Sequence, residues 1–256
     1  MSNEVIKKDT GSVALFGDDL QKGFENMTQE DMALPFVRIL GQLSPQVTDG
    51  DAKYIDGAKP GMIYNTVTSE CFDGKKGIKV IPCYYKKDFP EWSDRGDGPG
   101  APVAVHLPNS PVIQTGKRDG SKIRLPNGNY LEETASYYVL VQTKAGGMTP
   151  ALITMKSTQL NVSKKWNSMM KTIQIPDGKG GMAIPPMHGV VYNLQSVLQK
   201  NDKGSWYGWS VTQDRIMGQE DKSLYLTAKD FNSSVAKGNV QTKADVEEKA
   251  KDNTPY

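Results

Sequence analysis

Residues 151–173 read ALITMKSTQLNVSKKWNSMMKTI, and this segment combines a strand pattern with a helix pattern. Its first five residues are apolar apart from the β-branched Thr154, and this pattern predicts a strand. The Ser-Thr-Gln triplet at 157–159 offers N-cap candidates for a helix over residues 157–173, and Pro176 ends that helix. Trp166 belongs to an apolar stripe of this helix, which is typical of a core-facing side.

Strand patterns lie on both sides of this helix. Residues 78–85 and 137–141 precede it, and both are rich in β-branched and aromatic side chains. Residues 187–199 and 205–213 follow it and predict a hairpin around the turn at 201–204. The order of strands, one helix and a strand pair is compatible with an OB-type barrel, whose helix lies between strands three and four. We expect a mainly β (α+β) protein, an OB-type five-stranded Greek-key barrel with one principal helix and extended loops, although other α+β folds share this order.

The two ends of the chain differ in composition from its centre. Residues 1–31 hold seven acidic residues and three lysines and predict a flexible acidic arm. Residues 232–256 hold few large apolar side chains and many charges, and predict a flexible tail. Between them, residues 32–231 are expected to form a single β-rich nucleic-acid-binding domain.

Composition excludes several classes of protein. Two cysteines, Cys71 and Cys83, cannot build a disulfide framework or a four-cysteine zinc site. The two histidines exclude a site of three imidazoles, and the sequence contains no P-loop and no nucleophile elbow. No uncharged stretch is long enough to cross a membrane, and the first residues do not read as a secretory signal. We therefore expect a cytoplasmic protein with no cofactor, no metal and no membrane contact.

Charge is distributed unevenly, although the chain has 31 basic and 29 acidic residues. Residues 134–176 contain no aspartate or glutamate but contain five lysines. Two further basic stretches span residues 75–87 and 117–124. A basic centre between acidic arms is typical of a surface that binds a polyanion.

Aromatic residues are interleaved with these lysines, notably in residues 84–92 and 203–209. Lysines that follow the phosphates, together with rings that stack on unpaired bases, favour a single strand over a duplex. The residues predicted to contact phosphates are Lys86, Lys87, Lys156, Lys164 and Lys165. The residues predicted to stack on bases are Tyr84, Trp92, Tyr137, Trp206 and Trp209.

Several segments together resemble single-stranded-DNA-binding proteins of the replication and recombination region of tailed bacteriophages. The resemblance covers residues 32–217 and is carried by residues 34–40, 43–47, 57–65, 78–92, 157–166 and 201–209. It implies an OB-type fold, a DNA-coating role in the host cytoplasm, and replication or recombination proteins as further partners. Such proteins often end in a strongly acidic tail with a terminal aromatic residue. Here residues 242–256 hold four acids against three lysines before Tyr256, so recruitment of partners by this tail is in doubt.

Two other functions stay open. The chain could be a phage structural or assembly protein that binds protein or packaged DNA. A metal-dependent enzyme acting on nucleic acid would need paired carboxylates, and the nearest candidates are Glu132, Glu133, Asp73 and Asp88. Because these acids lack a recognisable spacing, we expect a non-catalytic protein.

Overall fold

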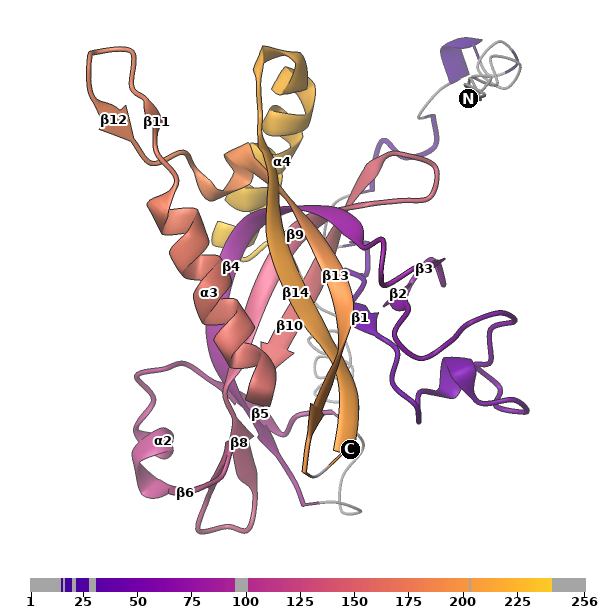
Figure 1. The fold of residues 1–256 in the computed structure, drawn as a ribbon, viewed down its shortest axis with the longest axis vertical. Coiled ribbons are helices and arrows are strands. Elements are labelled where there is room, and N and C mark those ends of the chain that lie inside the picture. Colours follow the sequence, from indigo (N-terminus) through magenta and orange to yellow (C-terminus); the bar gives the residue numbers. More distant parts are fainter. Residues whose placement is uncertain are drawn as a thin grey trace.

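The computed structural model describes residues 15, 17–19, 22–27, 31–94, 101–202 and 204–240. The expectations for residues 1–14 and for the end of the tail, including Tyr256, concern residues outside this part. The protein is mainly β, as predicted, and a curled antiparallel sheet forms its centre (Figure 1). Five strands pair in the order β10 (Met148–Lys156), β9 (Thr134–Gln142), β4 (Ile78–Trp92), β13 (Val190–Asn201) and β14 (Gly204–Ile216).

The longest strand, β4, has β13 along one side and β9 along the other. Its first residues pair with β13, and most of its length pairs with β9. The register against β9 shifts between Pro82 and Tyr84, which marks a β-bulge. Because Pro82 has no N–H to donate, a bulge is one of the few ways it fits inside a sheet. The bulge also reverses which residues of β4 face each side of the sheet.

A small sheet is inserted between β4 and β9. It contains β5 (Ala104–His106), α2 (Pro111–Thr115), β6 (Lys117–Asp119), β7 (Lys122–Arg124) and β8 (Tyr130–Glu132). β5 and β8 both pair with the end of β4, so the insertion extends the central sheet at that end. A turn at Gly120 joins β6 to β7, and its φ of 60° is a conformation that suits glycine.

The N-terminal segment lies against the other edge of the sheet. It contains β1 (Val37–Ile39), η3 (Pro45–Val47), β2 (Ile63–Asn65) and β3 (Cys71–Phe72). The Leu152 N–H of β10 donates to the Pro35 carbonyl over 2.8 Å, and Phe36 forms a parallel bridge with Leu152. In the described part of the chain β10 and β14 do not pair with each other. Instead, Gln159 Oε1 accepts the Trp209 N–H of β14 over 2.7 Å.

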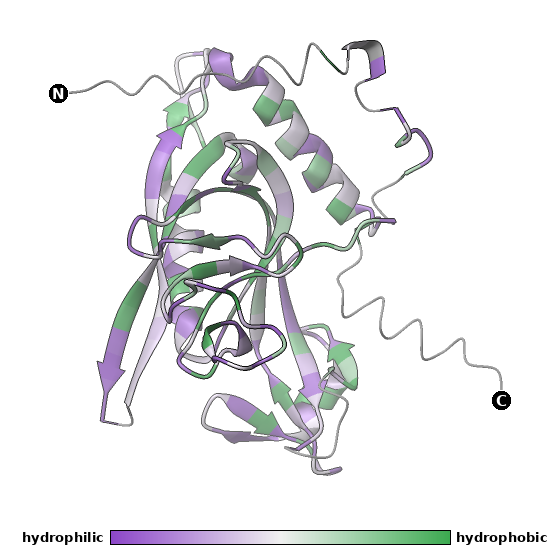
Figure 2. Ribbon diagram, turned by 90° about the vertical axis from the view of Figure 1, so that its right-hand side faces the viewer, coloured by the Kyte–Doolittle hydropathy of each residue, from purple (hydrophilic) through white to green (hydrophobic). Residues whose placement is uncertain are grey.

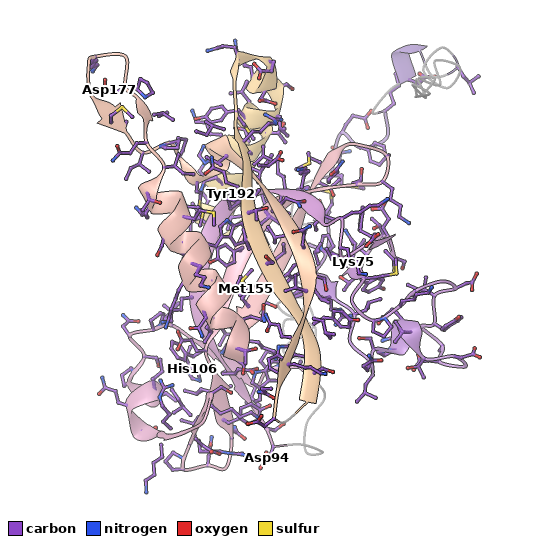
Figure 3. All side chains as sticks on the ribbon, viewed as in Figure 1. Lys75, Asp94, His106, Met155, Asp177 and Tyr192 are labelled. Carbon is purple, nitrogen blue, oxygen red and sulfur yellow. The ribbon has the colours of Figure 1, made fainter. Side chains whose placement is uncertain are left out.

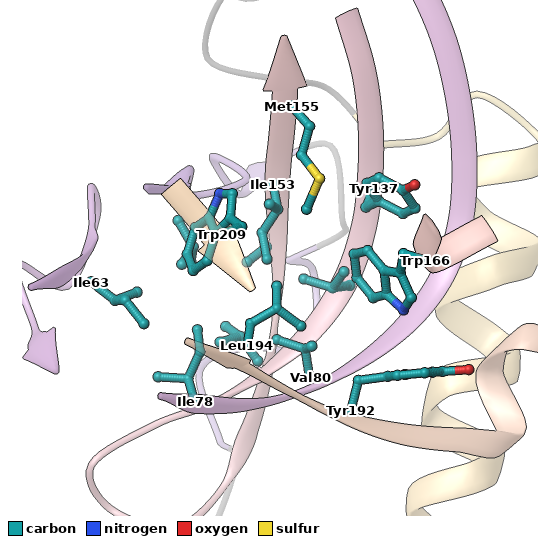
Figure 4. Packing of buried hydrophobic residues seen from close by; sticks show 14 of the residues in the cluster. Ile63, Ile78, Val80, Tyr137, Ile153, Met155, Trp166, Tyr192, Leu194 and Trp209 are labelled. Atoms are coloured by element: carbon teal, nitrogen blue, oxygen red, sulfur yellow. The ribbon is translucent and has the colours of Figure 1, made fainter. Parts of the chain in front are cut away.

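The helix predicted for residues 157–173 is confirmed and packs inside the curl of the sheet. A short 3-10 turn, η4 (Ser157–Gln159), leads into α3 (Leu160–Thr172). Trp166 is completely buried and stacks on Tyr137, with the ring centroids 4.3 Å apart. Tyr192 meets the same indole edge-on (Figure 4). One apolar cluster therefore joins α3 to β9 and β13.

A second long helix corrects the prediction of one principal helix. α4 (Lys222–Ala236) lies against the opposite face of the sheet. Its Ala228 and Phe231 are buried against Ile81 and Cys83 of β4. Hydrophobic and hydrophilic residues alternate in bands along this helix and along the strands (Figure 2). α4 begins in the expected domain and ends at Ala236, five residues beyond the expected boundary at 231.

The remaining described elements lie at the ends of the molecule. β11 (Ile175–Pro176) and β12 (Met182–Ala183) form a projecting hairpin that carries Asp177. His106 and Asp94 lie at the opposite end, on the insertion (Figure 3). η5 (Met187–Gly189) and η6 (Gln219–Asp221) flank the β13–β14 pair. No helix in the described ranges is both long enough and apolar enough to cross a membrane.

Candidate nucleic-acid interface

A groove of about 1090 Å³ lies on the face of the sheet that α4 covers only in part. β4, β9 and β10 form its floor, and the insertion and β14 lie along its sides. Successive residues of a strand point to opposite faces, so every second residue lines the groove. The groove-lining residues of the three floor strands are Tyr84, Lys86, Asp88, Pro90, Trp92, Thr134, Ser136, Tyr138, Leu152, Thr154 and Lys156, and Glu132 at the end of β8 joins them.

Two of the five predicted phosphate-binding lysines lie in this groove. Lys86 forms an ion pair with Asp88 over 3.2 Å, and Lys156 forms one with Glu132 over 2.8 Å. Their side chains are 41% and 54% exposed, so both ammonium groups reach the rim. Arg38 of β1 also lines the groove and is exposed. Three cations thus stand beside two carboxylates.

The other three predicted lysines lie away from the groove. Lys87 follows Lys86 and therefore points to the opposite face, where its Nζ lies 2.6 Å from Glu133 Oε1. Lys164 and Lys165 are exposed on α3, which packs on the opposite face of the sheet. The structure does not bring these two lysines together with Lys86 and Lys156.

The predicted stacking rings divide between the groove and the core. Tyr84 and Trp92 line the groove, and Lys156 Nζ lies 6.0 Å from the Trp92 ring centroid. Tyr137 is completely buried under α3, so it cannot stack on a base, and its assignment is corrected. Trp209 borders the groove but is only 5% exposed and packs in the core, so its assignment is corrected as well. Trp206 lies half-buried on the β13–β14 arm and does not line the groove.

Tyr207 lies next to Trp206 and, unlike it, lines the groove, although it was not among the predicted stacking residues. Its ring packs on Gly61, where an added Cβ would lie 2.5 Å from Tyr207 Cε1. Gly61 also has a φ of 87°, so this position requires glycine on two grounds. Alternation along the strand predicted that Trp206 and Tyr207 point to opposite faces, but not which face holds the groove.

Tyr130 is a second ring that the sequence analysis missed. The register pairs it with Trp92 on one side and with Arg124 on the other, so the three side chains share one face. Lys122 Nζ lies 3.6 Å from the Tyr130 ring centroid. This face continues that of Trp92 onto the insertion. The alternation of charged residues in 122–124 was visible in the sequence, but the pairing of β8 with β4 was not.

A hydrogen-bonded cluster fixes the insertion to the end of β4. The Glu91 carboxylate is buried and lies 2.7 Å from His106 Nε2. It also accepts hydrogen bonds from Asn129 Nδ2 over 2.6 Å and from Asn127 Nδ2 over 3.1 Å. Burial raises the pKa of Glu91, but these hydrogen bonds together outweigh it and the pKa is lowered. Glu91 therefore stays ionised and connects β4, β5 and the loop before β8.

The carboxylates considered for metal chemistry do not all converge, although Glu132 and Asp88 both line the groove. Glu132 faces the groove, whereas Glu133 bonds to Lys87 on the other side of the sheet. Asp73 lies in a turn, where its Oδ1 accepts the Lys75 N–H. Within the described ranges no group of three or more His, Cys, Asp or Glu side chains is placed to hold a metal ion.

Fold and groove together define a mainly β protein with an open groove lined by cations and aromatic rings. A protein-family model described as "Pam3 phage gp34-like protein" matches residues 7–241, and the chain belongs to this family. It is thus a phage protein, which confirms the bacteriophage part of the predicted resemblance. No curated protein and no solved structure matches the chain.

Proposed function

We propose that this phage protein is an OB-type, sequence-tolerant single-stranded-DNA-binding protein without catalytic activity. The order of strand pairing supports the fold. Counted along the chain, β4, β9, β10, β13 and β14 are strands one to five, and they pair in the order 3-2-1-4-5. α3 lies between strands three and four, as in an OB-type Greek-key barrel.

The position of the groove is the observation that carries the function. It lies on the face of strands two and three, with the insertion after strand one on one side and β14 of the last hairpin on the other. OB-type proteins bind oligonucleotides on this face and with the connections between strands one and two and between strands four and five. The groove therefore coincides with the place where the fold presents single strands.

Its residues fit an unpaired strand. Arg38, Lys86 and Lys156 stand where they can contact phosphates, and Trp92 and Tyr84 present rings. Stacking contributes about 1–3 kcal/mol per base and tolerates every sequence. A duplex hides its base faces, so the rings favour the single strand. We further propose that the protein acts in phage DNA replication or recombination in the host cytoplasm, together with proteins of those processes.

Neighbouring lysines on opposite faces of β4 provide the test. We expect Lys86→Ala to weaken binding of a labelled single-stranded oligonucleotide in fluorescence anisotropy, and Lys87→Ala to leave it near the wild-type value. Trp92→Ala should cost about 1–3 kcal/mol of binding free energy. Circular dichroism establishes that each variant is folded. Wild-type protein that binds no single strand at low salt would overturn the proposal.

Binding to protein during phage assembly is the second candidate, and the apolar surface of the insertion favours it. Val103, Val105 and Leu107 are 53%, 44% and 54% exposed, and they recur at every second position. Val105 and Leu107 also line the groove. If the uncharged replacements Val105→Ser and Leu107→Ser together reduced phage assembly and left oligonucleotide binding unchanged, this second function would be favoured.

A further inference from the structure

The floor of the groove is rich in hydrogen-bond acceptors. The side chains of Glu132 and Asp88 are only 12% and 10% exposed, yet both residues line the groove. Thr134 and Ser136 lie beside them on β9 and are also mostly buried. Lys86 and Lys156 approach these carboxylates from the rim, where their own side chains are far more exposed.

This arrangement fixes which part of a nucleotide points inward. A phosphate is repelled by two carboxylates in a partly buried groove, where charges are weakly screened. Phosphates are therefore confined to the rim beside Lys86, Lys156 and Arg38, and the bases face the floor. Glu132 can still accept hydrogen bonds from the bases. A carboxylate has about four lone-pair sites, and Lys156 Nζ donates to only one of them, on Oε2.

We infer that the groove floor, through Glu132, selects bases that carry an exocyclic amino group, cytosine and adenine, over thymine. This inference rests on the proposed binding of single strands and adds a base preference to it. The amino group of cytosine donates to a carboxylate, which is a known base contact of glutamate and aspartate. Thymine presents O4 where cytosine has its amino group, so the carboxylate repels this oxygen, and the single donor of thymine, N3–H, lies between two carbonyl oxygens.

Cytosine and thymine homopolymers give the sharpest comparison, because both bases are pyrimidines with similar stacking surfaces. We expect oligo-dC to bind about tenfold more tightly than oligo-dT of equal length at equal salt, within the range for one base-edge contact. Glu132→Gln keeps the shape of the side chain but removes its charge, and it should bring the ratio of the two dissociation constants close to one. Loss of a negative charge should tighten both complexes, so the ratio is the readout.

Glu133→Gln is the matched control, because it removes the same charge from the next residue on the opposite face. Its dC-to-dT ratio should equal that of the wild type. Equal or tighter wild-type binding of oligo-dT overturns the inference, as does a Glu132→Gln ratio that matches the wild type. If Glu132→Gln does not fold, the wild-type ratio together with that of Asp88→Asn decides. Failure of every oligonucleotide to bind would instead refute the proposed function.

Discussion

Tyr137 shows how one buried polar atom connects the sheet to a helix. Its hydroxyl oxygen lies 2.7 Å from Ser163 Oγ and 2.9 Å from Asn167 Oδ1, both on α3. Burial of the ring raises the pKa of this phenol, so it stays neutral and able to donate. The residue therefore stabilises the packing of α3 on β9 and is not available to a ligand.

Replacing Tyr137 by phenylalanine tests this role. We expect the free energy of unfolding to fall by about 1–2 kcal/mol, because buried partners lose a hydrogen bond while the stacking on Trp166 is kept. Urea denaturation followed by circular dichroism measures the change. Tyr54→Phe is the control, since Tyr54 is 41% exposed. Equal stability of the two variants would contradict the assigned role.

The residue types of the candidate site were predictable, but the side of the sheet was not. Alternation established that Lys86 and Lys87, and likewise Tyr137 and Tyr138, point to opposite faces. Which face becomes the core depends on where α3 and α4 pack, and the residues of β4 and β9 themselves do not contain that information. Tyr137 therefore looked as suitable for stacking as Tyr84 or Trp92.

η5 and α4 meet at His188, and this contact between two elements depends on pH. The His188 ring lies 5.3 Å from that of Tyr225 of α4, centroid to centroid. Burial lowers the pKa of His188, and the charge of Lys229 lowers it further. The folded protein thus binds a proton at this site less readily than the unfolded chain does.

Stability should therefore decrease on mild acidification. Since the folded pKa lies below the unfolded value of about 6.5, the unfolded state takes up the proton first as the pH falls through that value. We expect the melting temperature to decrease between about pH 7.5 and pH 5.5, and His188→Gln to reduce this decrease. A pH profile of His188→Gln parallel to that of the wild type would exclude His188 as its source.

The C-terminal part of α4 contributes to the stability of the fold. Asn232 Nδ2 donates to the Cys83 carbonyl over 2.5 Å, and Val235 packs on the cluster beneath α4. A chain ending at residue 231 should be less stable than one ending at residue 240 by about 1–2 kcal/mol, for one partly buried valine and one hydrogen bond. Chemical denaturation of the two proteins measures this, and equal stabilities would support the predicted boundary at 231.

α4 was predictable in principle, whereas the pairing of the insertion with β4 was not. Leu224, Ala228, Phe231 and Val235 follow the spacing of one helical face, which the charged residues around them concealed. The helix at 157–173 was found because Trp166 and its neighbours form a stronger apolar stripe. β5 and β8 are three-residue strands that exist through pairing with β4, and such long-range pairing leaves little trace in local sequence.

In the molecule as a whole, the groove and α3 carry separate sets of cations. Arg38 and Lys86 line the groove, whereas Lys164 and Lys165 are exposed on α3, against the opposite face of the sheet. Lys156 of the groove and Lys164 and Lys165 of α3 were predicted to belong to one site, because one acid-free stretch of chain contains all three. A single strand that follows the groove contacts only the first surface.

The salt dependence of binding separates the two surfaces. Each phosphate contact contributes about 0.7 to the slope of log K against log salt concentration for a single strand. Arg38→Ala with Lys86→Ala should therefore reduce the slope by about 1.4. Lys164→Ala with Lys165→Ala removes the same charge and should leave the slope unchanged, because neither lysine reaches a strand in the groove. Anisotropy titrations at several salt concentrations measure both. If the α3 variant lost as much slope as the groove variant, the strand would have to cross α3, and the groove would no longer define the path of the DNA.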